Sequence, residues 1–304
     1  MNRLVTAGQS YNLIGLCKLF GVSRQSYYQR KEANFHELAI KSCILEHVRK
    51  VRLDFPRMGY LKLYEICSTY FGGDFTMGRD AFYHLLYDNG LMLKLKKRTT
   101  RTTDSRHSYF LYPNLIRNFK PVSPCQLWVS DITYIPVGDG FCYLSLITDA
   151  FSRKIVGWNF ADSLKYCNAE QALREAIASA ESEGFNLKGL IHHSDRGVQY
   201  AYNAYTDILK KHGCMISMTE NGDPLENAMA ERVNGILKQE WLNYYTFQNQ
   251  EEAHEVIERI IRLYNERRPH MGINMRTPNQ IHNQGCKCQN NSVSLPTMKT
   301  QDYL

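Results

Sequence analysis

Three acidic residues that lie far apart along the chain are the strongest candidates for catalysis. Asp131 lies inside the apolar run WVSDITYIPV, Asp195 ends the run LIHHSD, and Glu231 follows after 35 intervening residues in a polar stretch of helical character. Carboxylate oxygens are the ligands that Mg²⁺ prefers, and two such ions can hold the attacking and leaving oxygens of an in-line phosphoryl displacement. The three acids therefore predict a divalent-metal site that cuts and joins DNA.

Each acid has a simpler explanation when it is considered alone. Asp131 would accept hydrogen bonds from backbone at a sheet edge, Asp195 would cap a turn or pair with Arg196, and Glu231 would be one solvated charge on a polar helix. An ionised group in the middle of an apolar strand is costly to bury without a partner, which favours a metal at Asp131. The hypothesis rests on the three acids taken together.

Polar residues near Glu231 are candidates for contacts to DNA. Lys238 follows it by seven residues, or two helical turns, and so projects from the same face, where it is predicted to hold a phosphate beside the metal-bound one. Asn227 and Asn234 flank this stripe and are predicted to bind sugar or phosphate oxygens. The alternative for all three is an ordinary exposed polar helix.

Polar residues beside Asp195 provide two further DNA-contacting candidates. The side chains of His192 and His193 point to opposite faces of a strand, and only His193 shares the face of Asp195. Arg196 follows the acid directly and carries a charge suited to phosphate. We therefore predict that His193 and Arg196 contact DNA.

The segments that hold the three acids alternate between strand and helix. Hydrophobic patterning predicts strands at residues 127–136, 141–149, 154–160, 190–194 and 214–218, and helices at 164–183, 202–211 and 226–244. Gly138-Asp139-Gly140 is predicted to form the turn of the first hairpin. This order implies a mixed sheet with helices on its faces, in which strand ends and a flanking helix can converge.

Charge is distributed unevenly along the chain. Residues 1–120 hold 20 Lys/Arg against 9 Asp/Glu, whereas residues 121–304 hold 17 against 21, within a formal net charge of +7. A basic front part is typical of a module that binds a polyanion. We expect DNA binding to be concentrated there.

Composition excludes several classes of protein. A chain of 304 residues with 43% hydrophobic content is long enough for a sizeable core, and it contains no apolar run of membrane-spanning length. The N-terminus lacks the apolar centre of a signal peptide, so we expect a cytoplasmic, nucleoid-associated protein without membrane contact. The nine cysteines show no paired CxxC spacing, and we expect most to be reduced and buried and no structural zinc. Cys286 and Cys288, in a polar tail, are open to metal binding or oxidation, with a plain tail as the alternative.

Small helical modules are predicted before the sheet. Residues 1–35 are predicted to form a helix-turn-helix, with Gly21 at the turn, Ser23 as an N-cap and Arg24 presented to DNA, although a plain helical hairpin has a similar pattern. Residues 36–98 are predicted to form a second DNA-binding module, with helices at about 38–54, 61–71 and 77–89. The alternating segment LMLKLKK is predicted as a strand or wing that brings cations to DNA, or as a solvated edge strand; these cations are Lys94, Lys96, Lys97 and Arg98.

A basic linker is predicted at residues 99–124. Its aromatic residues are interleaved with Lys and Arg, which favours tracking of a nucleic-acid backbone, and a plain interdomain tether is the alternative. The catalytic core is placed at residues 125–248. An apolar stripe in the helix that follows is expected to pack on this core or on another protomer.

Motifs along nearly the whole chain resemble those of one known family. WVSDITYIPV, HHSDRGVQY and DPLENAMAERVNGILKQEW, with their acids in register, and YNERRPHMGINMRTPNQIH further on, are similar to bacterial insertion-sequence transposases of the DDE type, relatives of retroviral integrases. The resemblance implies a ribonuclease-H-like fold with a mixed five-stranded sheet. It also implies catalysis and metal binding by Asp131, Asp195 and Glu231, with two Mg²⁺ or Mn²⁺ ions. A C-terminal helix and motif are expected at 249–283, and a disordered tail at 284–304.

The resemblance also implies a reaction and a set of partners for this chain. The expected reaction is metal-dependent cleavage at the ends of an insertion sequence, followed by transfer of the freed 3′-hydroxyl. The expected partners are double-stranded DNA (terminal inverted repeats and target), further copies of the chain, and a DNA-binding protein from an upstream reading frame.

Two other classes of protein remain open from the sequence alone. A catalytically silent DNA-binding regulator would keep the basic front part but would have no need for three acids. A ribonuclease-H-type nuclease would keep the sheet and metals but has no obvious use for the helical modules. Loss of DNA joining on Glu231→Gln, with binding retained, separates the transposase from both.

Overall fold

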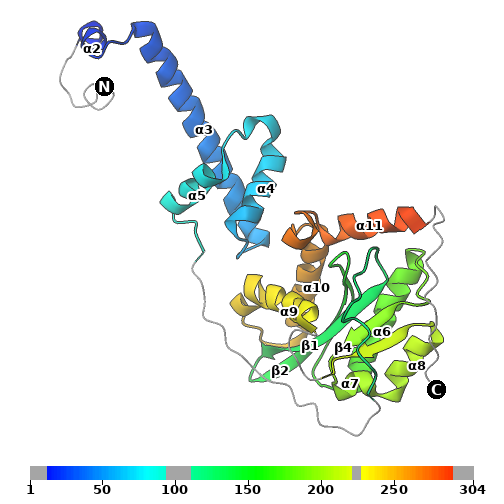
Figure 1. Ribbon diagram of the computed structural model, residues 1–304. Coiled ribbons are helices and arrows are strands. Elements are labelled where there is room, and N and C mark those ends of the chain that lie inside the picture. The colour runs from blue at the N-terminus through cyan, green and yellow to red at the C-terminus, as the bar shows by residue number, and fades with distance from the viewer. Residues whose placement is uncertain (1–11, 94–110, 221–226, 290–304) are drawn as a thin grey trace. The chain divides into compact units, whose positions relative to one another are not determined.

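A computed structural model describes residues 12–93, 111–220 and 227–289, with only the backbone of 285–289. Contacts within the chain divide it into two units, residues 1–94 and 95–304. Figure 1 shows helices alone in the first unit and a sheet with helices in the second. No helix within the described ranges is long and apolar enough to cross a membrane.

The first unit is a set of helices held together by a small apolar core. Its helices are α2 (Leu13–Leu19), α3 (Arg24–Asp54), α4 (Tyr60–Phe71), the 3-10 helix η1 (Gly72–Asp74) and α5 (Arg79–Asp88). The helix predicted at about 38–54 forms the second half of α3 and packs on α4, which in turn packs on α5. Ile44, Val48, Leu63, Phe82 and Leu86 are all fully buried. The predicted helices at 61–71 and 77–89 are thus found within a residue or two of their expected bounds.

One continuous helix, α3, runs through the predicted boundary at residue 35. Ser23 caps this helix as predicted, with its hydroxyl oxygen accepting from Ser26 N at 3.0 Å. Arg24–Asp54 contains no Gly or Pro, so nothing in the sequence ends the helix between its two expected halves. The predicted strand at the end of this unit is absent from residues 91–93, and Lys94, Lys96, Lys97 and Arg98 lie outside the described residues.

The second unit is built on a five-stranded sheet. Its strands are β1 (Leu127–Val137), β2 (Gly140–Asp149), β3 (Ile155–Ala161), β4 (Ile191–Ser194) and β5 (Met215–Met218), in the order β3-β2-β1-β4-β5. The first three strands are antiparallel, whereas β4 pairs parallel with both β1 and β5. This mixed sheet confirms the predicted ribonuclease-H-like arrangement.

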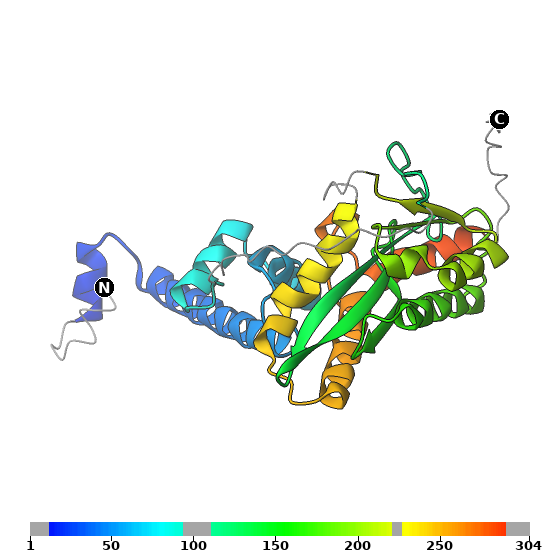
Figure 2. The same ribbon diagram turned by 90° about the horizontal axis from the view of Figure 1, so that it is seen from below.

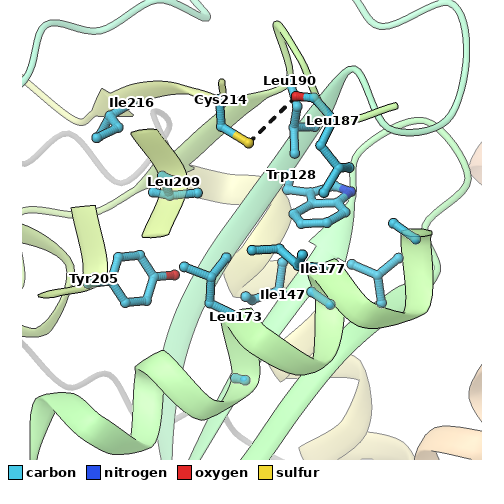
Figure 3. Packing of buried hydrophobic residues seen from close by; sticks show 14 of the residues in the cluster. Trp128, Ile147, Leu173, Ile177, Leu187, Leu190, Tyr205, Leu209, Cys214 and Ile216 are labelled. Atoms are coloured by element: carbon cyan, nitrogen blue, oxygen red, sulfur yellow. Dashed lines mark hydrogen bonds between the residues drawn. The ribbon is translucent and has the colours of Figure 1, made fainter. Parts of the chain in front are cut away.

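Helices cover both faces of this sheet (Figure 2). On one face, α6 (Tyr166–Ser182), α7 (Val198–Ala201) and α8 (Asn203–Lys211) bury the main apolar core with Trp128 of β1 at its centre (Figure 3). On the other, α9 (Ala228–Glu240) packs Ala230 against Leu127 and Val129, and the 3-10 helix η3 (Leu242–Tyr244) follows it. Alternate residues of β1 therefore face different layers, and Asp131 shares the α9 face with Val129.

Part of the predicted linker belongs to this unit. Leu115 N donates to Ser217 Oγ at 2.9 Å, and Met218 N donates to Pro113 O at 3.4 Å. Arg117 also pairs with Glu220 at 2.5 Å. Residues 111–124 therefore lie along β5 and start the core earlier than the predicted boundary at 125.

The chain after α9 packs back onto the sheet. It forms α10 (Gln250–Glu266), the 3-10 helix η4 (Met271–Ile273) and α11 (Pro278–Gln289). Ala253, Ile260 and Tyr264 of the predicted apolar stripe are buried, so the stripe packs within its own chain. The first residues of the tail predicted from residue 284 are helical, because α11 continues to Gln289, and residues 290–304 lie outside the described residues.

A buried polar cluster fixes α11 to the sheet. His282 contacts Ser152 Oγ at 2.9 Å through Nδ1 and Glu183 Oε2 at 3.2 Å through Nε2. Ser152 Oγ donates to Asp149 Oδ1, and Lys154 pairs with Glu183 at 2.6 Å. Helix α11 is thus tied to the β2–β3 turn and to the end of α6.

Candidate active site

The pairing of β1 with β4 places two of the predicted acids side by side. Leu127, Trp128 and Val129 pair in order with Ile191, His192 and His193, an offset of 64 residues. The same offset, continued by two residues, sets Asp131 beside Asp195, where β4 has just ended. Neighbouring parallel strands lie about 4.8 Å apart, and side chains in register point to the same face. The two carboxyl groups therefore meet on the α9 face of the sheet.

The Asp131 carboxyl group is held by two hydrogen bonds. Its Oδ2 accepts from Asn234 Nδ2 at 2.7 Å, and its Oδ1 accepts from Ile132 N at 2.9 Å. Burial, followed by the negative charge of Asp195, raises the pKa of Asp131 to about 7, with a smaller contribution from Glu231 and with the two hydrogen bonds opposing the shift. The site thus gathers negative charge that a bound cation would stabilise.

Asp195 occupies a tight bend immediately after β4. Its Oδ1 accepts from Gly197 N at 3.0 Å, and a Cβ on Gly197 would lie 2.9 Å from the same oxygen. The bend therefore favours glycine at this position. Arg196 donates from Nε to Thr219 O at 2.6 Å, so its side chain is tied to the chain just after β5.

Glu231 lies in the first turn of α9 with an exposed side chain. Its charge contributes to the raised pKa of Asp131, which places the two acids within electrostatic reach of each other. Among the described residues, no three His, Cys, Asp or Glu side chains are arranged closely enough to hold a metal ion. Asp131 and Asp195 are thus assembled, with Glu231 at the margin of the pair.

Asn227 and Asn234 are buried between α9 and the sheet, each with 5% of its surface exposed. Asn227 Nδ2 donates to Ser130 O at 3.1 Å, while Asn234 donates to Asp131. These bonds hold α9 against β1 at the acid. Their burial argues against the predicted direct contact of either amide with DNA.

The two histidines of β4 are core residues. His193 is fully buried and contacts Ser217 Oγ of β5 at 2.8 Å through Nδ1. His192 contacts Ser130 Oγ at 2.8 Å, and burial lowers its pKa to about 3. His193 does share the Asp195 face, but its predicted contact with DNA is unsupported because its side chain is fully buried.

The remaining predicted DNA contacts are distributed over both units. Lys238, in the last turn of α9, has its Nζ 5.8 Å from the ring centroid of Tyr134, which follows Asp131 by three residues on β1. Arg24 is exposed at the start of α3, in the other unit. The contact of Lys238 with β1 and the exposure of Arg24 are compatible with the predicted DNA contacts, which stay predictions.

Sequence reasoning missed Tyr200, which is buried behind the two aspartates. Burial, and then the charge of Asp195, raises the pKa of its phenol well above the ordinary value. Its hydroxyl oxygen has no hydrogen-bond partner among the described residues. Its place in the motif HHSDRGVQY was visible in the sequence, but its position beneath the acids depends on α7.

The sheet order and the paired acids at its centre define an integrase-type catalytic core. Integrase core domain models match residues 121–224 and 212–278. An IS600 insertion-element protein of 31 kDa from Shigella sonnei, described as uncharacterized, is 33% identical and spans 86% of this chain and 96% of its own length. The chain belongs to the insertion-sequence transposases of the integrase core family, and it is a DDE-type polynucleotidyl transferase.

Other relatives share the same core. The transposase for insertion sequence IS904 of Lactococcus lactis is 33% identical, over 64% of this chain and 76% of its own length. The putative transposase for IS986/IS6110 of Mycobacterium tuberculosis is 34% identical, over 54% of this chain and 60% of its own length. Among solved structures, the HTLV-2 integrase catalytic core domain in complex with magnesium is 19% identical, with a TM-score of 0.43, over 54% of this chain and 99% of that one.

Proposed function

We propose that Asp131, Asp195 and Glu231 are the catalytic, metal-binding residues of this transposase. The proposed reaction is cleavage of DNA strands at the ends of an insertion sequence, followed by joining of the freed 3′-hydroxyl to target DNA. The observation that carries the proposal is the β1–β4 register, which brings the two aspartates together on the face where α9 begins. Glu231 joins them by its charge and by its place in the first turn of that helix.

The residues present fit a divalent cation. The site offers carboxylate oxygens, which are hard donors that suit Mg²⁺ or Mn²⁺. A bound cation would relieve the repulsion that raises the pKa of Asp131. We propose two ions in each site, which when bound would activate the attacking hydroxyl or water and stabilise the leaving oxygen.

The surrounding side chains hold the acids in place. Asn234 fixes one oxygen of Asp131, leaving lone pairs on both oxygens for a cation. The bend at Gly197 fixes one oxygen of Asp195. Lys238 lies two helical turns beyond Glu231, within reach of Tyr134, and is proposed to bind a phosphate of the DNA next to the reacting one.

The proposed substrates are the terminal inverted repeats of the element and a target duplex. The exposed cations of the first unit, including Arg24, are proposed to bind these duplexes, and Arg196 is proposed to contribute at the acids. Because two element ends must be brought together, we propose that the chain acts as a homo-oligomer on DNA, with an upstream-frame DNA-binding protein as a further partner. The place of action would be the bacterial nucleoid.

Substitution of the third acid tests the catalytic assignment. Glu231→Gln should lower joining of a labelled 3′-hydroxyl end to target DNA by roughly 100-fold or more, because a metal ligand contributes several kcal/mol to transition-state stabilisation. Binding of an end duplex should be unchanged. Glu258→Gln, an exposed change on α10, serves as the matched control. Undiminished joining by Glu231→Gln would reject the assignment.

The same assay separates the two alternative functions. A silent regulator would bind the duplex without metal-dependent cleavage, before and after the substitution. A ribonuclease-H-type nuclease would cut the RNA strand of a hybrid duplex and would leave DNA ends unjoined.

A further inference from the structure

A concave pocket of about 660 Å³ opens beside the candidate active site, on the α9 face of the sheet. This volume lies in the range of pockets that bind small molecules. Its walls come from the segment before β1, the β2–β3 turn, the start of α9 and the segment that includes η4, all within the second unit. The residues on which the argument depends are Phe119, Lys120, Phe151, Arg153, Asn227 and Arg276.

The pocket is continuous with the catalytic residues through Asn227. This residue lines the pocket and donates to the carbonyl oxygen of Ser130, the residue directly before Asp131. It is also the N-cap residue of α9, four positions before Glu231. A molecule in the pocket would therefore lie against both elements that carry these two acids.

The charged residues that line the pocket are all cations. Lys120, Arg153 and Arg276 are among them, and none of the described lining residues is acidic. Arg276 donates one N–H to Gln284, and a guanidinium group has five N–H donors. This lining is suited to an anion such as phosphate.

The uncharged lining is suited to an aromatic ring. Phe119 and Phe151 contribute two aromatic side chains to the lining, which also includes the apolar residues Leu127 and Val129. Single-stranded nucleic acid is bound in this way, by aromatic rings that stack on bases and by cations that hold the backbone.

An unsatisfied polar atom in the pocket wall provides an independent indication of a ligand. Asn227 is 5% exposed, and its Oδ1 has no hydrogen-bond partner in the part of the chain that the structure describes, whereas its Nδ2 is bonded to Ser130. Burying a hydrogen-bond acceptor without a partner costs free energy, and a hydrogen-bond donor on a ligand would remove that cost. The exocyclic amino group of adenine, cytosine or guanine is such a donor.

We propose that this pocket binds one unpaired nucleotide of the DNA substrate, with the base between the aromatic side chains and the phosphate on the cations. The proposal rests on the proposed function, since it requires that the neighbouring acids act on DNA. The pocket should therefore make the protein prefer DNA ends whose terminal nucleotides are unpaired. Duplex DNA alone would not enter a pocket of this size.

A comparison of DNA ends tests the proposal on the full chain. The probes are two duplexes of the same sequence, one blunt and one with a three-nucleotide 5′ overhang that contains 2-aminopurine. Fluorescence anisotropy gives the two dissociation constants, and 2-aminopurine emission reports whether the unpaired base changes its environment. Stacking and the polar contacts should make the overhang duplex bind roughly 10-fold tighter.

A variant that fills the pocket provides the decisive comparison. A Cβ on Gly272 would have no atom within 4 Å, so Gly272→Phe should enter the pocket without disturbing the backbone. Its matched control is Gly73→Phe, because Gly73 is likewise the middle residue of a three-residue 3-10 helix with open space around it. Gly272→Phe should reduce the overhang preference to about 1-fold and abolish the emission change, while Gly73→Phe should keep both.

Charge substitution gives a second, milder variant. Lys120→Gln with Arg276→Gln should lower the overhang preference several-fold, whereas Lys211→Gln with Lys210→Gln, on α8, should leave it unchanged. Equal affinity of the parent protein for the two duplexes, or an unchanged preference in folded Gly272→Phe, overturns the proposal. A different occupant, such as another segment of this chain, would give that result.

Failure of the pocket and failure of the proposed function are distinguishable. The overhang preference should persist in Glu231→Gln, because that substitution leaves the pocket intact. Metal-dependent joining without an overhang preference would reject nucleotide binding by the pocket and would leave the catalytic assignment intact. An overhang preference in a protein whose joining is insensitive to Glu231→Gln would reject the catalytic assignment instead.

Discussion

At the scale of single residues, the site combines acids with the amides that position them. Burial, and then repulsion from the negative charge of Asp195, raises the pKa of Asp131 to about 7. Asn234 opposes this repulsion by donating to one Asp131 oxygen from the buried side of α9. A carboxylate held in this way presents its remaining lone pairs in a fixed direction. Residues that hydrogen-bond to metal ligands commonly have this orienting effect.

Asn234→Ala tests this positioning role. Loss of the amide should lower joining by about 10- to 100-fold and raise the Mn²⁺ concentration needed for half-maximal joining, because Asp131 loses its orienting donor. The free energy of unfolding should fall by about 1–3 kcal/mol. The measurements are joining across a Mn²⁺ titration and urea unfolding. Asn243→Ala, exposed in η3, is the control, and a loss of stability without any change in Mn²⁺ dependence would contradict positioning.

Sequence alone predicted the acids but not the way in which they are held. Residue types and the 35-residue spacing indicated Asp131, Asp195 and Glu231, and strand alternation correctly placed His193 on the Asp195 face. The roles of Asn227, Asn234 and His193 were out of reach, because a hydrogen-bond partner about a hundred residues away is set by tertiary packing. Each was expected to bind DNA, and each is instead buried.

At the scale of elements, hydrophobic periodicity predicted all five strands and helices α6 and α8 within about two residues, whereas α7 was not predicted and α9 ends four residues before the expected position. The register between β1 and β4 was not predictable, because β4 has only four residues, of which Ile191 alone is apolar, and so short a strand is compatible with more than one pairing. The continuity of α3 was also missed. Its exposed first half has no apolar stripe, although the absence of Gly and Pro allowed the helix to continue.

The close approach of α6 to β3 depends on Gly157. A Cβ at this position would lie 2.3 Å from Ala172 O and 2.7 Å from Ala176 Cβ, both on α6. Gly157→Ala should therefore lower the free energy of unfolding by about 1–3 kcal/mol or more, because the helix must move away from the sheet. Thermal or urea unfolding measures the change. Gly73→Ala, which meets open space, should change stability by less than about 0.5 kcal/mol, and equal effects would contradict this account.

The attachment of α11 to the sheet predicts a pH dependence. The hydrogen bond from His282, and then that from Lys154, lowers the pKa of Glu183 from its ordinary value of 4.5 to about 2, against the opposing effect of burial. A carboxyl group with a depressed pKa stabilises the fold above the unfolded-state value and loses this contribution as pH falls through the folded-state value. The contribution is therefore complete above about pH 5 and is lost between about pH 4.5 and 2.

Glu183→Gln tests the sign of this linkage. At pH 7 the variant should be less stable than the parent by roughly 3 kcal/mol at most, and the difference should shrink as pH falls toward 2. Urea unfolding at several pH values measures it. Glu255 is exposed on α10, so the free energy of unfolding of Glu255→Gln should change with pH in the same way as that of the parent. A difference that stayed constant below pH 4.5 would contradict the role of the Glu183 charge.

At the scale of the whole molecule, the excess of positive charge and the proposed catalytic acids lie in different parts of the chain. Residues 1–120 carry an excess of 11 positive charges, while residues 121–304, which contain the acids, carry an excess of 4 negative charges. A polyanion should therefore be attracted by one part and acted on in the other once metal ions neutralise the carboxylates. The division also explains how an acidic site can work on a phosphate backbone.

This division predicts which cations control the salt dependence of DNA binding. Each phosphate contact releases counterions and adds about −0.9 to the slope of log affinity against log salt. Replacing the exposed cations Arg24, Arg30 and Lys31 of α3 by Gln should make the slope shallower by up to about 2.7, with weaker binding at every salt concentration. Anisotropy titrations of an end duplex between about 50 and 200 mM salt measure both quantities.

The matched control removes three cations from the acidic part of the chain. Lys165, Arg259 and Arg262 are exposed on the second unit, so replacing them by Gln changes the net charge by the same amount. If the first unit binds the phosphates, this control should leave the slope nearly unchanged, because long-range charge alone is screened beyond about 10 Å at these salt concentrations. Equal slopes for the two triple variants would instead mean that binding follows the net charge and that α3 makes no direct phosphate contacts.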